Sequence, residues 1–190
     1  ATSIKDSALD RVEEYFDNPR NLNMAVIRTS INIDAFNVVN ELKFKNKILF
    51  DYVKNGGNVI VQYNTTNNLV TKEIAPFELK LSRDRVTEED APVTFLSKNH
   101  PVLNQPNQIT NKDFDRWIQE RGLYFPNEWS KEFIPILAMN DKGESPSNGS
   151  LLVAKHGKGN YIYTGLSFFR ELPEGVSGAY KLLANLIALE

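Results

Sequence analysis

A strand–helix–strand pattern near the start of the chain constrains the fold more than any other feature. Residues 24–31, MAVIRTSI, are rich in β-branched and apolar residues and predict a strand. Residues 41–57 carry apolar residues at helical spacing and end in Gly56-Gly57, either of which can cap a helix. Residues 58–63, NVIVQY, predict a second strand with little alternation, as in a parallel strand covered on both faces. Such a βαβ unit predicts a parallel sheet with a right-handed crossover.

The C-terminal third of the chain predicts a hairpin and a final helix. Residues 151–157 and 158–166 read as two strands that turn at the sequence HGKG. This turn does not lead into a helix, so we interpret it as a hairpin turn and not as a phosphate-binding loop. Residues 178–189 carry a stripe of leucine and isoleucine at helical spacing and predict an amphipathic helix.

The middle of the chain is less regular. Residues 75–96 predict short strands around a charged turn, the clearest strand being APVTFL at the end. Thr110 or Asn111 can cap a short helix that ends near Gly122. We expect the aromatic segment 119–129 to be irregular, followed by a strand in IPILAMN. The sequence contains no internal repeat and no clear linker, so we predict a single domain over residues 1–190.

Composition excludes several classes of function. The formal net charge of the 190 residues is −2 and no basic run occurs, so nothing indicates nucleic-acid binding. No stretch approaches the roughly 20 apolar residues that span a bilayer. The absence of cysteine excludes disulfides, thiolate metal sites and a cysteine nucleophile. The chain begins with Ala and has no signal-type segment, and we therefore expect it to be a portion of a longer protein.

Nucleophilic catalysis is limited to Ser or Thr activated by a histidine. The sequence has two histidines, His100 before a proline and His156 in the hairpin turn. Ser167 and Thr65 are the candidate nucleophiles, although no G-x-S-x-G motif is present. The motif H-E-x-x-H is also absent, and the sequence predicts neither a metal site nor a cofactor.

Two polar and aromatic segments are candidate binding sites. Segment 119–129, QERGLYFPNEW, combines aromatic rings with amides and a guanidinium, which suits stacking on a sugar or a protein partner. The same rings could instead fill the end of the core. Segment 165–178 follows a predicted strand and carries Arg170, at the edge where α/β sheets bind ligands. The alternative role for Arg170 is an ion pair with Glu171 or Glu174.

Segments 49–65, 76–129 and 151–189 together resemble the C-terminal region of large bacterial PIG-L/LmbE-type deacetylase proteins. In that family a zinc-dependent N-acetylglucosaminyl deacetylase domain comes first, and a class I glutamine amidotransferase-like domain lies near the end. The resemblance covers roughly residues 24–190, and residues 1–23 match poorly. It implies a flavodoxin-like, three-layer α/β/α domain, related to ThuA-like domains and to β-galactosidase trimerisation domains. The expected sheet is mostly parallel with an antiparallel C-terminal hairpin.

The resemblance also bears on activity. The zinc motif of the deacetylases does not occur in this chain, so that activity cannot be carried over. The position of the amidotransferase cysteine corresponds best to Asn64, or else to Tyr63, and the position of the His-x-Glu pair falls at residues 168–171. Asn and Tyr cannot form the thioester of glutamine hydrolysis. Whether the fragment has any activity stays open.

We therefore expect a non-catalytic accessory domain that binds glycan or contacts sibling domains or another subunit. The alternative is a hydrolase or transferase with a remodelled Ser/Thr–His site, and a third possibility is a purely structural role in an oligomer. The resemblance implies a periplasmic or extracellular location. The candidate ligand-binding residues are Asn37, Tyr63, Asn64, Thr65, Arg83, Arg85, Arg121, Tyr124, Asn127, Trp129 and Arg170.

Overall fold

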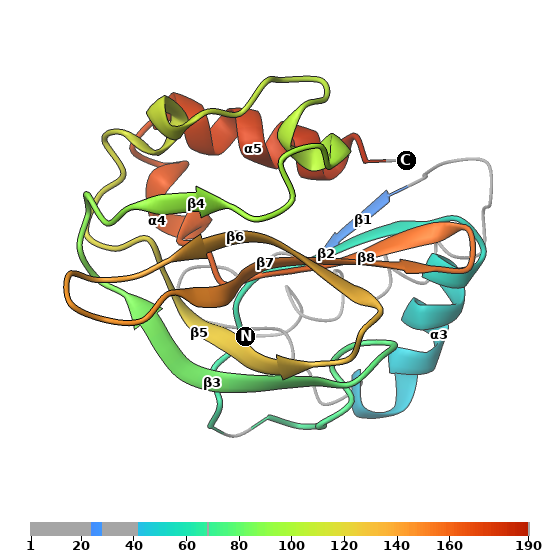
Figure 1. Cartoon of the computed structure of the whole chain (residues 1–190). Coiled ribbons are helices and arrows are strands. Elements are labelled where there is room, and N and C mark those ends of the chain that lie inside the picture. The colour runs from blue at the N-terminus through green and yellow to red at the C-terminus, as the bar shows by residue number, and fades with distance from the viewer. Residues whose placement is uncertain (1–23, 28–41, 68, 190) are drawn as a thin grey trace, which may run out of the picture.

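The computed structural model describes residues 24–27, 42–67 and 69–189, which form an α/β fold (Figure 1). The strands are β1 (Met24–Ile27), β2 (Asn58–Val61), β3 (Leu79–Val86), β4 (Val93–Phe95), β5 (Gly122–Trp129), β6 (Phe133–Met139), β7 (Ser147–His156) and β8 (Gly159–Thr164). The helices are α3 (Leu42–Lys54), α4 (Phe168–Glu171) and α5 (Ser177–Ile187), with two 3-10 turns, η1 (Pro101–Leu103) and η2 (Asn111–Phe114). Leu9, Val12 and Phe16 stand at helical spacing and predict a short first helix within residues 7–16. That helix and candidate residue Asn37 lie outside the described residues.

Six of the described strands form one mixed sheet in the order β1-β2-β8-β7-β6-β4. The β1, β2 and β8 pairs are parallel, and the pairs from β8 to β4 are antiparallel. β1, β2, β8 and β6 therefore run in one direction, and β7 and β4 in the other. The predicted strand–helix–strand unit and the C-terminal hairpin are both present, the hairpin pairing His156 with Gly159 across its turn.

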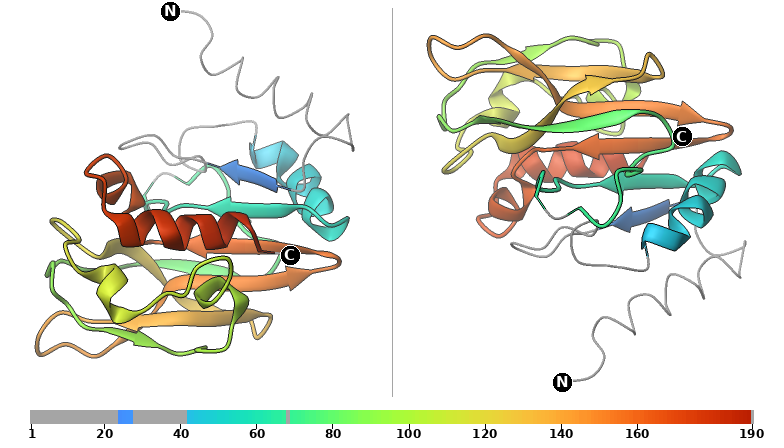
Figure 2. Two further views of the ribbon diagram at one scale, coloured as in Figure 1. Left: turned by 90° about the horizontal axis from the view of Figure 1, so that it is seen from above. Right: turned by 90° about the horizontal axis from the view of Figure 1, so that it is seen from below.

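The central strands β2 and β8 are buried along their whole length because both faces of the sheet are covered. Val59 and Val61 lie in a core beneath α3, and Ile60 belongs to a second core beneath α5. Figures 1 and 2 show α4 and α5 over one face of the sheet and α3 over the other. The described residues thus form helix, sheet and helix layers.

The predicted C-cap of α3 is confirmed. Gly56 has a φ of 118°, a conformation that favours glycine. The amide of Gly57 donates to the carbonyl of Tyr52 at 3.0 Å, and the amide of Gly56 donates to that of Val53. These two bonds end the helix and turn the chain directly into β2.

The expectation of irregular chain over residues 119–129 is wrong. Most of the segment is β5, which pairs with β3 in a separate two-stranded antiparallel sheet. The pairing between β3 and β5 shifts register repeatedly, so the segment lacks the regular alternation by which a strand is recognised in sequence.

The helix expected from Thr110 to Gly122 is also shorter than predicted. Only η2 forms, with the capping box of Thr110 and Asp113 at its start. In a continuing α-helix the amide of Ile118 would donate to the carbonyl of Phe114. That amide donates instead to the carboxylate of Glu171, at 3.0 Å, and that carbonyl accepts from the guanidinium of Arg121. Side chains from distant elements thus take the groups that the helix would need.

Candidate functional site

The carboxyl ends of β2 and β8 lie side by side because the two strands are parallel neighbours. β2 leads into residues 62–67, and β8 leads into α4. In open α/β sheets ligands bind beyond this edge of the sheet. The surface around these two strand ends is therefore the candidate site.

Three aromatic rings from three elements meet at this edge, and we call them the aromatic stack: Tyr63, Tyr124 and Phe169. Tyr63 and Tyr124 are stacked, with ring centroids 6.2 Å apart and planes at 10°. The ring centroids of Phe169 and Tyr63 are 5.1 Å apart. The guanidinium of Arg170 lies over the Phe169 ring, 4.9 Å from its centroid. The stack joins the end of β2 to β5 and to α4.

Asn64, which the resemblance aligned with the amidotransferase nucleophile, is fully buried. Its side-chain amide donates to the carbonyl of Gln62 at 2.9 Å, and its backbone amide donates to the hydroxyl of Tyr163 at 3.0 Å. A nucleophile elbow is a sharp, strained turn that exposes its side chain. Asn64 is not among the described residues with a positive φ. The Asn64 side chain is therefore hydrogen-bonded inside the loop and is not exposed to a ligand.

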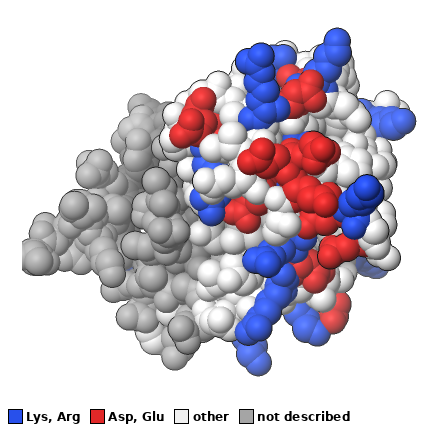
Figure 3. Space-filling model, turned by 90° about the vertical axis from the view of Figure 1, so that its left-hand side faces the viewer, with Lys and Arg blue, Asp and Glu red and all other residues white. Residues whose placement is uncertain are grey.

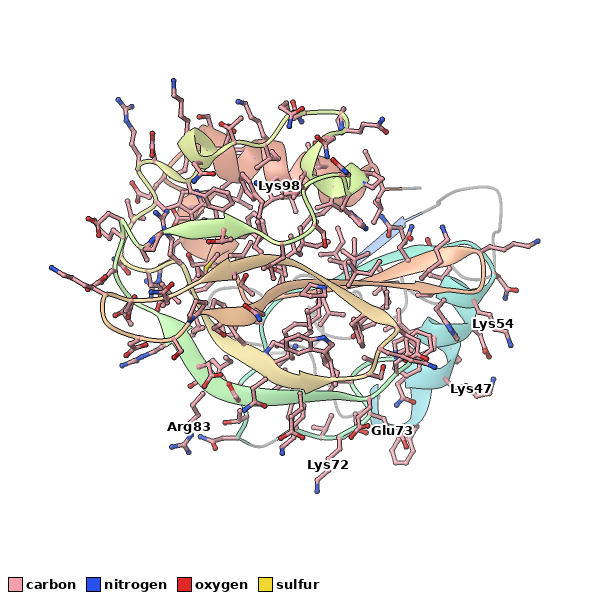
Figure 4. The ribbon with its side chains drawn as sticks, viewed as in Figure 1. Lys47, Lys54, Lys72, Glu73, Arg83 and Lys98 are labelled. Atoms are coloured by element: carbon pink, nitrogen blue, oxygen red, sulfur yellow. The ribbon has the colours of Figure 1, made fainter. Side chains whose placement is uncertain are left out.

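A surface pocket of about 500 Å³ lies beside the aromatic stack, and we call it the β3–β5 pocket. Its lining residues are Asn67, Arg83, Arg85, Glu120, Leu123 and Tyr124. Figure 4 shows Arg83 extending from β3 away from the body of the molecule. The structure thus brings together three candidate residues, Arg83, Arg85 and Tyr124, and places a fourth, Tyr63, directly behind the Tyr124 ring.

The pocket depends on an unusual backbone at Tyr124. Leu123 and Tyr124 both line the pocket, although consecutive side chains of a regular strand point to opposite faces. Tyr124 has a φ of 53°, in the left-handed region that non-glycine residues rarely adopt. Such a conformation costs about 1–3 kcal/mol and persists where its surroundings hold it in place. Here the stacking against Tyr63 holds the ring at the pocket.

Arg170 pairs with neither Glu171 nor Glu174. Its Nε lies 2.7 Å from a carboxylate oxygen of Glu120, which lines the β3–β5 pocket. The ion pair ties α4 to the segment before β5 and offsets the negative charge of Glu120. Arg170 therefore acts on the pocket through Glu120 and through the aromatic stack.

The other candidate residues do not reach the pocket. Arg121 is buried and donates to the carbonyls of Ala91 and Phe114. Trp129 packs against the core beneath α3, and Asn127 is exposed farther along β5. Thr65 is half-buried and donates its hydroxyl to the carbonyl of Asn67, a pocket residue, at 3.1 Å.

Ser167 and Glu171 form a buried polar pair next to the site. The Ser167 hydroxyl lies 2.6 Å from the carbonyl of Glu120 and 3.1 Å from a carboxylate oxygen of Glu171. Burial raises the pKa of Glu171 from 4.5 to about 7, although hydrogen bonds from Ile118 and Ser167 and the charges of Arg121 and Arg170 oppose the shift. A buried carboxyl group with a raised pKa therefore lies at the end of α4.

The two histidines have other partners. The Nδ1 atom of His100 accepts a hydrogen bond from the amide of Val102 at the start of η1. His156 packs edge-on against Phe77 at the β7–β8 turn. β8 separates that turn from Ser167, a distance of about 17 Å along the strand. The hydroxyl of Ser167 instead lies within hydrogen-bond distance of the carbonyls of Glu120 and Arg121 and of the carboxylate of Glu171.

Three pocket residues were missed by the sequence interpretation: Asn67, Glu120 and Leu123. Glu120 lies in the candidate segment 119–129, and Asn67 lies two residues after the candidate residue Thr65. Leu123 carries no chemical signal, and only the register of β5 against β3 reveals its place. The sequence interpretation considered Glu171 as a partner for Arg170 and within the position of the His-x-Glu pair, and no local pattern indicates that its carboxyl group is buried.

A second pocket of about 570 Å³ lies on the other side of Arg83 and Arg85. It is lined by β3, by the end of β6 and by the segment before β7, including Asp84, Asp141 and Glu144. Figure 3 shows acidic side chains concentrated on the face that looks left in Figure 1, with basic side chains along its margins. Asp141 has a structural role, because its carboxylate accepts hydrogen bonds from the amides of Thr87 and Glu88 at 2.9 Å.

Within the described part of the chain, no group of three or more His, Cys, Asp and Glu side chains is arranged to hold a metal ion. The described helices include none with the length and apolar character needed to cross a membrane.

The fold and this edge of the sheet define an α/β protein with a surface pocket where parallel strands end. No family model matches the sequence, and no match to a curated protein was found. The fold is similar to that of two solved Salmonella typhimurium structures. Cytoplasmic Protein STM3548 is 17% identical with a TM-score of 0.56, over 90% of this chain and 73% of that one. Cytoplasmic Protein STM1381, from strain LT2, is 15% identical with a TM-score of 0.54, over 87% of this chain and 70% of that one.

These neighbours correct one expectation. The resemblance implied a periplasmic or extracellular location, whereas both structural neighbours are described as cytoplasmic proteins. The structural neighbours therefore contradict the expected periplasmic or extracellular location. The error arose because the location was transferred from a family on the basis of sequence similarity alone. Sequence segments that determine a fold do not determine cellular location.

Proposed function

We propose that this chain is a non-catalytic, amidotransferase-like accessory domain that binds a glycan in the β3–β5 pocket. The flavodoxin-like, three-layer architecture and the relation to LmbE-type deacetylase proteins are parts of the same proposal. The mixed sheet with helices on both faces is compatible with that architecture.

The observation that carries the proposal is the composition of the pocket at the carboxyl edge of the sheet. A tyrosine, two arginines, a glutamate and an asparagine line a volume of about 500 Å³, which suits a small ligand. Aromatic faces pack against sugar rings, and the planar polar groups can bind hydroxyls. The pocket has this character without a nucleophile paired to a base.

The absence of catalysis is supported by the chemistry at the strand ends. Asn64 cannot replace a thiolate, and its side chain faces the loop interior. Glu171 occupies the segment where the family carries its histidine and glutamate, yet its carboxylate is buried and bound to Ile118 and Ser167.

Binding is tested by titrating the protein with neutral amino-sugar oligosaccharides, followed by calorimetry and by amide NMR shifts. We expect shifts at Tyr124 and Leu123 and around Arg83, and none in α5 on the opposite face. The variant Tyr124→Asn removes the ring, and Asn tolerates the left-handed backbone, so it should fold and lose binding. Tyr124→Phe is the matched control and should retain it. Titration without a shift at any pocket residue would exclude glycan binding.

A contact role for α3 is the second candidate, favoured by two apolar side chains on its outer face. Phe44 is 79% exposed and Ile48, one turn later, is 48% exposed. Adjacent apolar residues on a surface helix are typical of an interaction surface for a sibling domain or a second subunit. Light scattering of the wild type and of Ile48→Lys tests self-association, and unchanged mass in both would leave only a sibling domain as partner.

The alternative of a remodelled hydrolase or transferase requires a histidine that reaches Ser167 or Thr65. The recorded hydrogen bonds connect Ser167 to glutamate and to backbone carbonyls, and Thr65 to Asn67. Hydrolysis of chromogenic acyl or glycosyl substrates by the wild type, lost in Ser167→Ala or Thr65→Val, would favour that alternative over the binding domain.

A further inference from the structure

We infer that the β3–β5 pocket selects a sugar that carries a carboxylate, such as a uronic acid. Arg83 and Arg85 would hold the carboxylate, and the face of Tyr124 would carry the sugar ring. The inference rests on the proposed glycan binding and adds to it the charge of the ligand.

The pocket is formed where the ladder between β3 and β5 is interrupted. Leu81 pairs with Pro126 and Asp84 pairs with Phe125, so Ser82 and Arg83 have no partner in the register. On the other strand, Phe125 and Leu123 are paired and Tyr124 is skipped. The skipped residues Arg83 and Tyr124 both line the pocket. Such irregularities re-aim side chains and are frequent beside binding sites.

The interruption is stabilised from within. The Ser82 hydroxyl donates to the carbonyl of Phe125 at 2.7 Å and accepts from the amide of Asp84 at 2.8 Å. These bonds satisfy backbone groups that the broken ladder would leave without partners. The placement of Arg83 and Tyr124 on either side of the Asp84–Phe125 pair is therefore held by a defined structure.

The charge balance of the pocket favours an anion. Within the described ranges, neither Arg83 nor Arg85 takes part in an ion pair. Among the described residues that line the pocket, the one acid, Glu120, is already paired with Arg170. Arg83 and Arg85 thus line the pocket without a direct ion pair, although the charge of Arg85 also lowers the pKa of Asp141 in the second pocket. A guanidinium fork binds a carboxylate through paired hydrogen bonds, which a neutral hydroxyl cannot match.

The surroundings limit the ligand to a single charged group. The second pocket, on the other side of the two arginines, carries Asp84, Asp141 and Glu144. Figure 3 shows that this face of the molecule is rich in acidic side chains. These charges would repel a long polyanion that extended beyond the arginines. A sulfated polymer or a nucleic acid is therefore disfavoured relative to a small sugar acid.

The ring of Tyr124 is already in place for stacking. One face of the ring lies against Tyr63, and Phe169 packs on Tyr63 from α4. A platform fixed in this way loses little conformational entropy when a ligand binds. The proximity of Tyr124 to the arginines within one pocket allows a ring and its carboxylate substituent to be bound together.

The inference is tested by calorimetric titration with a glucuronate-containing disaccharide and a neutral amino-sugar disaccharide of the same size, at two salt concentrations. We expect the acidic sugar to bind about tenfold more tightly or better, and its advantage to shrink at high salt. Arg83→Gln/Arg85→Gln should abolish the advantage. The matched control is Lys72→Gln/Lys98→Gln, which removes the same charge from exposed side chains outside the pocket (Figure 4). This control should bind as the wild type does.

The outcomes separate the two proposals. Equal binding of both sugars, with no loss in the arginine variant, would overturn the preference for a carboxylate and leave glycan binding intact. Binding of neither sugar would overturn both. Tighter binding of heparin than of the disaccharide, lost equally in both double variants, would show attraction to total charge and would also overturn the inference. The thermal unfolding of each variant establishes that it is folded.

Discussion

At the scale of single residues, the most informative side chains are buried ionisable groups that interrupt a helix. Glu171 and Arg121 bind the amide of Ile118 and the carbonyl of Phe114, which would otherwise bond to each other. Each residue is ionisable and buried, and each is compensated by hydrogen bonds to the backbone. The segment between η2 and β5, which ends at the ligand pocket, is therefore held by side-chain chemistry and not by its own secondary structure.

We expect Glu171 to make the protein less stable as the pH rises. Its folded-state pKa of about 7 lies above the ordinary 4.5, so the folded protein holds this proton more tightly than the unfolded chain does. The stabilising contribution is complete below pH 4.5 and is lost as the pH rises through about 7. Over this range the shift corresponds to about 3 kcal/mol.

Urea unfolding of the wild type and of Glu171→Gln between pH 5 and pH 8 measures this contribution. The two proteins should have similar stability at pH 5, and the variant should be more stable at pH 8. His100 and His156, whose pKa values burial lowers, act in the opposite direction in both proteins and cancel in the difference. A difference that does not vary with pH would contradict the prediction.

We expect Arg121→Lys to destabilise the fold by about 2–3 kcal/mol. A lysine ammonium cannot span the carbonyls of Ala91 and Phe114 as the guanidinium does, and one of these buried groups would lose its partner. Denaturant midpoints give the magnitude. Arg116→Lys, on an exposed neighbour, is the control and should change stability by less than about 0.5 kcal/mol. Equal effects in both variants would mean that the buried bonds contribute little.

At the scale of elements, the close approach of α5 to η2 determines how the helical layer packs. A Cβ added to Gly178 would lie 1.7 Å from the carbonyl oxygen of Asp113. The same oxygen accepts a hydrogen bond from the indole of Trp117 at 3.0 Å. Lys181 of α5 also pairs with the Asp113 carboxylate at 2.8 Å. The helix can therefore pack against η2 only because its first turn contains glycine.

We expect Gly178→Ala to destabilise the protein by about 2 kcal/mol, even though alanine favours a helix by about 1 kcal/mol. The added methyl group would push η2 away and disturb the indole of Trp117, so near-ultraviolet circular dichroism should change as well. Ser177→Ala, on the adjacent exposed position, is the control and should have a small effect. Stabilisation by Gly178→Ala would show that the two elements separate without cost.

At the scale of the whole molecule, the central sheet joins two cores that share the strands β2 and β8. Consecutive residues of these strands contribute to opposite cores, so neither core can form without the same strands. The prediction of one domain over residues 1–190 implies that the two cores unfold together. The two tryptophans of the sequence are convenient probes, because Trp117 belongs to one core and Trp129 packs against the other.

We expect one cooperative unfolding transition. In Trp129→Phe the fluorescence reports on the core beneath α5, and in Trp117→Phe it reports on the core beneath α3. Within each variant, the fluorescence midpoint should coincide with the midpoint from far-ultraviolet circular dichroism. Separate midpoints in either variant would mean that the two layers unfold independently.

The sequence by itself determined the elements whose signals are local. The cap at Gly56-Gly57, the hairpin turn at 156–159 and the leucine stripe of α5 are confirmed, because spacing and glycine conformation act over a few residues. The strand predicted over residues 58–63 forms over residues 58–61. The sequence also identified the segments of the candidate site, and three of its residues line the pocket.

Only the tertiary structure decided the rest, because those features depend on contacts between distant segments. β5 is a strand through its pairing with β3, and the helix after Thr110 stops because Glu171 and Arg121, from later in the chain, bind its backbone groups. The interrupted ladder that brings Arg83 and Tyr124 to one pocket leaves no periodic trace in either strand. Arg121 is buried, whereas Arg83 and Arg85 are exposed. No local sequence pattern distinguishes the buried arginine from the two exposed ones.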